Sequence, residues 1–97
     1  MANYIALLQL TDQGVRSIKD TTKRAAAATD MASRMGVKIV DAFWTLGPYD
    51  VVLIAEAPDD ETMTACAIKL SSFGNVKTQT MRAFRATEMD AILSKVK

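Results

Sequence analysis

The fold is decided by the stretch Leu46-Gly47-Pro48-Tyr49-Asp50-Val51-Val52-Leu53-Ile54-Ala55, in which a turn leads directly into the most apolar run of the chain. Gly, Pro and Asp are the usual residues of tight turns. Val, Leu and Ile at successive positions indicate a strand that is covered on both faces. We therefore predict a hairpin that enters a buried central strand over residues 51–57.

Three further segments read as strands. Residues 3–10 contain five successive apolar positions, Tyr4 to Leu8, and predict a second central strand. Residues 37–46 alternate less cleanly, although Phe43 and Trp44 favour a strand, and residues 76–84 are polar and rich in threonine. We interpret these last two segments as edge strands.

Two helices are expected between the strands. Apolar or small residues recur in steps of three and four after the capping residue Thr11 or Asp12, which predicts one long helix ending at Gly36. The stripe consists of Val15, Ile18, Thr22, Ala25, Ala28, Ala32 and Met35. A second helix begins in the acidic run 59–61 and ends before Gly74, with a buried stripe of Met63, Cys66, Ala67, Leu70 and Phe73.

A short final helix is expected from about Glu88 to Val96, because Thr87 and Asp90 have the spacing of a capping box. The full order matches the ferredoxin-like βαββαβ sandwich, an α+β fold with a four-stranded antiparallel sheet whose first and third strands are central. We expect a single domain over residues 1–97, with no linker or repeat.

One face of the predicted sheet has nothing to cover it, because both helices must pack on the same side. We place Glu56 on this open face. Val52 and Ile54 then share it, together with Ile5, Leu7 and Gln9 of the first strand, whereas the edge residues Trp44 and Arg82 could point to either face. An open apolar face marks an interaction surface. We predict a homodimer, or a higher homo-oligomer, in which two sheets pack together as a dimeric α/β barrel.

Composition argues against several classes of function. Twelve Lys and Arg balance eleven Asp and Glu, which argues against nucleic-acid binding, and no apolar run is long enough to span a membrane. We expect a cytoplasmic protein without a cofactor or a metal. Cys66 is the single cysteine and reads as a core residue, and the absence of histidine removes the usual general base.

The best acid–base candidate is Glu56, with Gln9 and Arg82 beside it, because a carboxylate in an apolar cavity would have a raised pKa. An interface salt bridge or a solvated glutamate explains the same pattern. Tyr49 and Asp50 form a second candidate pair. Neighbours on an extended chain point to opposite faces, however, so a turn in which Asp50 bonds backbone amides is the simpler interpretation.

Two groups of charged residues have simpler explanations than a metal site or a binding surface. Asp59, Asp60 and Glu61 lack the ligand spacing of a calcium loop and suit the start of a helix. Four basic residues on the first helix form a stripe that we interpret as a solvated face; they are Arg16, Lys19, Lys23 and Arg24.

Residues 45–60, with the run Gly47-Pro48-Tyr49-Asp50, resemble the signature of the GYD domain family. The resemblance extends to Tyr4-Ile5, Thr11 and Gly14 near the start, and to Gly74-Asn75-Val76, Thr78, Thr80 and Arg82-Ala83-Phe84 near the end. It implies a small bacterial or archaeal protein similar in fold to the dimeric α/β-barrel group. That group includes cofactor-independent monooxygenases, lactone isomerases and amino-acid-sensing domains, and those chemistries that rely on histidine are doubtful here.

Three hypotheses for function follow. The first is a non-enzymatic oligomeric module that binds a small, mostly apolar metabolite in a cavity at the sheet or the dimer interface. The second is a cofactor-independent oxygenase or isomerase with Glu56 as base and Tyr49 or Arg82 stabilising an oxyanion. The third is a purely structural assembly protein. The residues expected to bind a ligand are Gln9, Trp44, Tyr49, Asp50, Glu56 and Arg82.

Overall fold

A four-stranded antiparallel sheet forms the body of the protein, in a computed structural model that describes all of residues 1–97. Its strands are β1 (Ala2–Leu10), β2 (Lys38–Trp44), β3 (Val51–Ala57) and β4 (Val76–Ala83), in the order β2-β3-β1-β4. The two central strands are therefore the two apolar ones, as predicted, because only strands with neighbours on both sides are shielded from water along their whole length.

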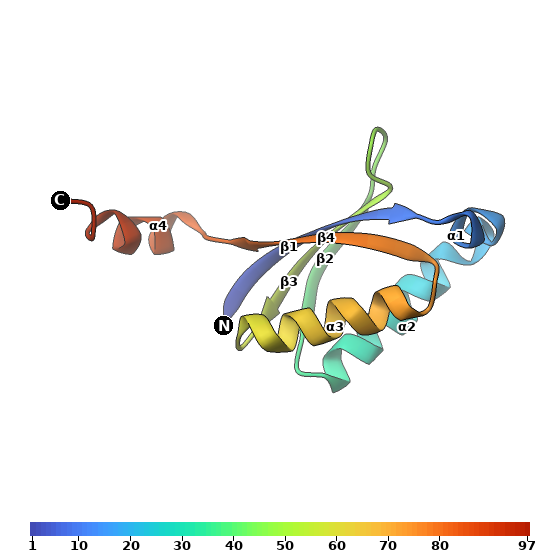
Figure 1. Cartoon of the computed structure of the whole chain (residues 1–97), viewed down its shortest axis with the longest axis horizontal. Coiled ribbons are helices and arrows are strands. Elements are labelled where there is room, and N and C mark those ends of the chain that lie inside the picture. Colours follow the sequence, from blue (N-terminus) through green and yellow to red (C-terminus); the bar gives the residue numbers. More distant parts are fainter.

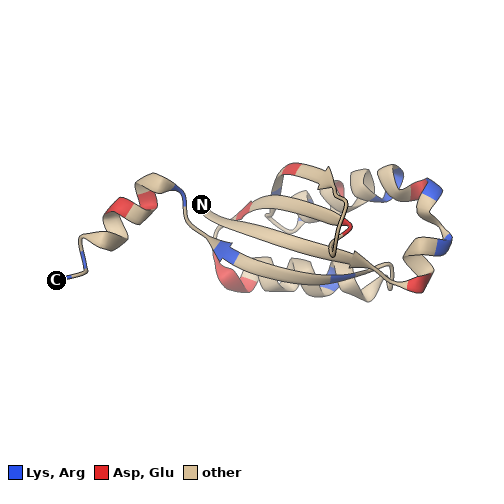
Figure 2. Ribbon diagram, turned by 90° about the horizontal axis from the view of Figure 1, so that it is seen from above, with Lys and Arg blue, Asp and Glu red and all other residues tan.

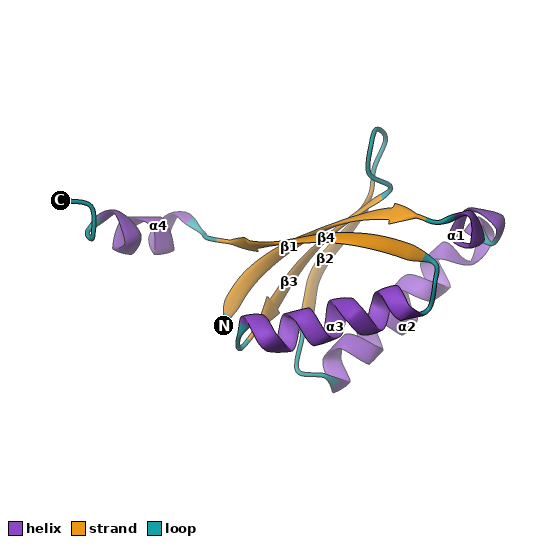
Figure 3. Cartoon of the chain, in the orientation of Figure 1, coloured by secondary structure: helices purple, strands orange, loops and turns teal.

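The two long helices, α2 (Thr21–Arg34) and α3 (Asp60–Ser72), lie on one face of the sheet (Figures 1 and 3). The shorter elements are α1 (Asp12–Arg16), the single 3₁₀ turn η1 (Ile18–Asp20) and α4 (Ala86–Leu93). α2 packs over β2, and α3 packs over β4 and β3. None of these helices is both long enough and apolar enough to cross a lipid bilayer.

The core lies between the sheet and the two long helices. Tyr4, Ala55 and Ala57 of the central strands pack against Met63 and Cys66 of α3, with Ala32 and Val37 completing the cluster. Ala6, Leu8 and Val51 form a second cluster at the other end of the same face. The predicted division of the two faces is confirmed. The core residues of the central strands alternate with Ile5, Leu7, Val52 and Ile54, so the cross-strand pairs Ile5–Ile54 and Leu7–Val52 lie on the side away from the helices.

The single long helix predicted over residues 12–35 is wrong, because the chain changes direction at Ser17 and again before Thr21. α1 is attached to the turn that precedes β4, where the Thr11 hydroxyl donates to the Gly74 carbonyl at 2.5 Å. α2 is attached at the opposite edge of the sheet, where Trp44 Nε1 donates to Thr21 Oγ1 at 3.0 Å. One straight helix cannot reach both edges, so the predicted core residue Val15 is exposed.

The ends of α2 and α3 are formed as predicted, and the start of α4 is not. Gly36 and Gly74 have positive φ and end α2 and α3 as predicted. α4, however, begins earlier than expected and does not use Thr87 as its cap. Glu88 Oε1 instead accepts from the Arg85 backbone N–H at 3.0 Å. A glutamate reaches this amide more easily than Asp90 could reach that of Thr87, because it has one more methylene.

α4 stands away from the body as an arm (Figure 1). It gives the molecule a longest dimension of 52 Å and a radius of gyration of 14.5 Å, against about 12.5 Å for a compact chain of this length. Met89 and Leu93 are exposed one turn apart on α4, and Val96 is exposed just beyond the end of the helix. The arm thus carries an apolar stripe that its own chain does not cover.

Gly14 is where α1 and the α3–β4 turn meet, and a side chain there should destabilise the fold. A Cβ atom at this position would overlap the Asn75 carbonyl oxygen. We expect Gly14→Ala to lower the free energy of unfolding by about 1–3 kcal/mol, the usual cost of overpacking. Urea unfolding measures this, with Thr22→Ala on the exposed side of α2 as a control that changes little. An unchanged or raised stability, the usual result of Gly→Ala within a helix, would contradict the close approach.

Candidate functional site

A cavity of about 250 Å³ lies between the sheet and helices α2 and α3. It exists because the two helices pack over opposite halves of the sheet and because α2 presents small side chains, Ala25, Ala28 and Ala32, toward it. Leu8 and Leu53 of the central strands form its floor. The cavity is lined by 25 residues, of which 19 are hydrophobic, so it suits a ligand that is mostly apolar.

The six other lining residues are Thr21, Arg24, Thr29, Asn75, Thr78 and Thr80. Arg24 is therefore the only charged residue of the cavity. It is half-buried, and both ion pairs of the chain belong to Arg82, so the Arg24 guanidinium has no ionic partner. Thr80 Oγ1, on the β4 side, is buried and has no hydrogen-bond partner. These two groups are the polar features that a ligand could satisfy.

The structure does not gather the predicted binding residues at one site. Trp44 lines the cavity, whereas Gln9, Tyr49 and Glu56 lie on or beside the opposite face of the sheet. Glu56 pairs with Asn3 near the start of β1, and Gln9 lies six residues further along that strand, which is about 20 Å away. The grouping of Glu56, Gln9 and Arg82 is therefore wrong. Glu56 cannot act as a base on a ligand in the cavity, because the sheet separates them.

Three of these residues instead hold the hairpin to the sheet. Asp50 Oδ2 accepts from the Leu10 backbone N–H at 2.8 Å, and the Gln9 amide donates to the Pro48 carbonyl at 3.0 Å. The Tyr49 hydroxyl donates to Gln79 Oε1 on β4 at 2.8 Å. Each polar group therefore has a partner within the protein. This arrangement agrees with the interpretation of the turn as structural.

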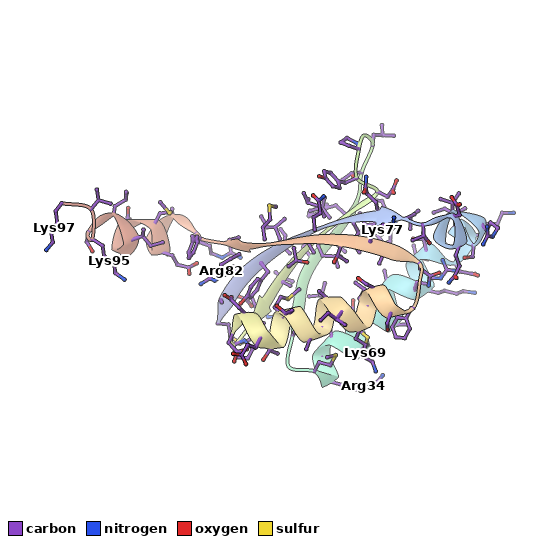
Figure 4. The ribbon with its side chains drawn as sticks, in the orientation of Figure 1. Arg34, Lys69, Lys77, Arg82, Lys95 and Lys97 are labelled. Atoms are coloured by element: carbon purple, nitrogen blue, oxygen red, sulfur yellow. The ribbon has the colours of Figure 1, made fainter.

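Arg82 lies on the helix side of β4, opposite Tyr4 of β1. Its guanidinium is 5.6 Å from the centre of the Tyr4 ring and 4.4 Å from that of Phe84. It is also 4.0 Å from Asp60 and 3.8 Å from Glu88, the nearest atoms in each case. Figure 4 shows it at the root of the arm. Because these contacts link β1, α3 and α4, they fix the direction in which the arm leaves the body.

The open face of the sheet is apolar and uncovered. Ile5, Leu7, Val52 and Ile54 are half-buried there, and Phe43 and Met81 on the edge strands are 48% and 46% exposed. In Figure 2, which looks onto this side, charged residues lie mainly near strand ends, in the helices and in the arm. Exposed apolar area of this kind is typical of an interface.

Arg24 is the functional candidate that the sequence interpretation missed. The basic pattern groups it with Arg16, Lys19 and Lys23 in a solvated stripe, and one long helix gives no reason to separate them. In the structure Arg16 lies before the change of direction and Arg24 after it. Four consecutive alanines follow Arg24. Such a run of small side chains leaves space beside the sheet, and it is the signal that could have identified this residue.

Comparison with known proteins places the chain in context. The model of the GYD domain family matches residues 4–93. A protein of Thermus thermophilus, named glutamine synthetase and cystathionine beta-lyase binding protein, is 34% identical over 94 residues. That alignment covers 96% of this chain and 99% of the relative.

Solved structures share the fold at lower identity. TTHA0845 from Thermus thermophilus has a TM-score of 0.59 at 22% identity, over 89% of this chain and 96% of that one. FFRP-DM1 has a TM-score of 0.61 at 16% identity, over 87% and 100%. An ACT domain protein from Streptococcus pneumoniae has a TM-score of 0.52 at 15% identity, over 100% and 98%. These likenesses confirm the ferredoxin-like class of fold.

Tyr4 should give the protein a dependence of stability on alkaline pH. Burial and a 2.5 Å hydrogen bond to Asp60 raise the pKa of Tyr4 to about 12. The folded state thus keeps a proton that the unfolded state releases near pH 10, so stability falls as pH rises from about 10 toward 12 and is unaffected below. We expect Tyr4→Phe to weaken this dependence and Tyr49→Phe to retain it, in urea unfolding at several alkaline pH values. Equal slopes in wild type and Tyr4→Phe would contradict the assignment.

Proposed function

The chain belongs to the GYD domain family, and we propose that it is a protein-binding module that pairs with a second copy of itself and docks onto a metabolic enzyme. The relative from Thermus thermophilus is named for binding glutamine synthetase and cystathionine beta-lyase. The alignment to it spans nearly the whole of both chains, so the surfaces that serve binding in the relative have counterparts here.

The observation that carries the proposal is apolar surface that this chain leaves uncovered in two separate places. The first is the open face of the sheet, formed by Ile5, Leu7, Phe43, Val52, Ile54 and Met81. A flat apolar face of this kind is self-complementary, because a two-fold axis that lies in the plane between two facing sheets brings the same side chains of both copies together. We assign it to a second copy of the chain.

The second uncovered place is the stripe on the arm, formed by Met89, Leu93 and Val96. A short amphipathic helix of this kind inserts its apolar side chains into a groove of a partner. The arm projects beyond the sheet (Figure 3), so its stripe stays accessible when two sheets pack face to face. We assign it to the partner enzyme.

Self-association is tested by placing a charge at the centre of the open face. We expect the wild type to sediment as a dimer at micromolar concentration and Ile54→Glu to sediment as a monomer, because the carboxylate would be buried between the sheets without a partner. Circular dichroism checks that the variant is folded. Lys69→Glu, on the exposed side of α3, is the matched control and should remain dimeric. A monomeric wild type, or a dimeric Ile54→Glu, would overturn this assignment.

Partner binding is tested with purified glutamine synthetase from the same organism. We expect calorimetry to detect a complex, and Leu93→Ser to weaken it by about tenfold, as truncation of an interface anchor commonly does. Ala91→Ser, elsewhere on the exposed surface of α4, should bind like the wild type. Equal affinities would place the contact away from the arm. Absence of binding by the wild type would remove glutamine synthetase as the partner.

A second candidate function is the binding of a small, mostly apolar molecule. The observation that favours it is the cavity between the sheet and helices α2 and α3, whose walls are apolar apart from a few polar groups. Trp44 is the one predicted binding residue that lines it. This function is compatible with the first, because the cavity and the open face lie on opposite sides of the sheet.

A further inference from the structure

We propose that the cavity binds a short aliphatic monocarboxylate, with the carboxylate on Arg24 and the hydrocarbon chain between α2 and α3. This inference rests on the proposed binding of a small molecule and names the class of ligand. It is drawn from three properties of the cavity: its charge, its size and the placement of its polar groups.

The cavity carries a positive charge that no carboxylate of the chain balances. Arg24 is the only charged residue among those that line the cavity, and no carboxylate of the chain forms an ion pair with it. Because Arg24 is half-buried and has no ionic partner, an anion can pair with its guanidinium without displacing a carboxylate of the chain. Carboxylates suit arginine especially well, because two parallel N–H···O bonds can form.

The cavity has the size of a small organic molecule. A volume of about 250 Å³ holds about eight non-hydrogen atoms when each takes the volume of a water molecule, about 30 Å³. A six-carbon carboxylate has that number of atoms. Ala25 and Ala28 of α2 and Ala67 and Leu70 of α3 offer only hydrocarbon to the rest of the ligand. The chain of the ligand is therefore expected to be aliphatic.

The placement of the polar groups distinguishes this ligand from other anions. A phosphate or a dicarboxylate would need a second cation, and the other polar lining groups are neutral side chains of Thr and Asn. An amine would be repelled by Arg24. A neutral alcohol of the same length could enter but would leave the guanidinium without an ionic partner, so it should bind more weakly.

The test uses three ligands that share a six-carbon chain: hexanoate, hexanol and hexylamine. Isothermal titration of the wild type should show hexanoate binding at least about tenfold more tightly than hexanol, and no binding of hexylamine. Arg24→Gln should reduce hexanoate affinity to that of hexanol without changing hexanol affinity. Lys23→Gln, which removes the same charge from the exposed side of the same helix, should leave both unchanged.

A further variant separates the ligand class from the cavity. Ala28→Leu fills the space and should abolish binding of both hexanoate and hexanol, while circular dichroism reports a folded protein. Hexanol binding as tightly as hexanoate, or equal losses in Arg24→Gln and Lys23→Gln, would overturn the carboxylate class and leave binding in the cavity standing. Failure of both compounds to bind at millimolar concentration would overturn the ligand class and the small-molecule function together.

Discussion

The structure depends on one constraint: a sheet of four strands is covered by helices on one side only. Both central strands are apolar on both faces, as the pairs Ile5–Ile54 and Ala6–Leu53 illustrate. Helices α2 and α3 cover one face of the sheet, and the cavity lies between them and that face. The other face is left to water or to another protein. The proposed self-association and the proposed ligand binding are thus two consequences of the same layering, one on each side of the sheet.

Much of the fold could be predicted because its signals are local. The central strands are marked by unbroken apolar runs, and Gly36 and Gly74 mark helix ends through a conformation that other residues avoid. The helix over residues 12–35 could not be predicted in the same way. Its break is set by two anchors that lie far apart in the sequence, Gly74 at one edge of the sheet and Trp44 at the other.

The candidate site was harder to predict, because it depends on which face each edge residue takes. Trp44 and Arg82 lie on the helix side only because of the registers of β2 and β4, and β2 contains an irregularity between Ile39 and Asp41 that shifts its alternation. No local pattern encodes that shift. Arg24 carries the same charge as Lys23 beside it, and only the packing of α2 distinguishes the two.

The contacts of Arg82 have a mechanical consequence. Besides the chain itself, two contacts of Glu88 join the arm to the body. Glu88 accepts a hydrogen bond from Asn3 and lies beside the Arg82 guanidinium, which also contacts Asp60, the first residue of α3. α3 is one wall of the cavity. An enzyme docked on the arm therefore acts on that wall through Arg82, and also through β4, which precedes the arm and packs against α3. If a ligand and an enzyme each favour a different position of α3, the two binding events share one free-energy balance and each reports on the other.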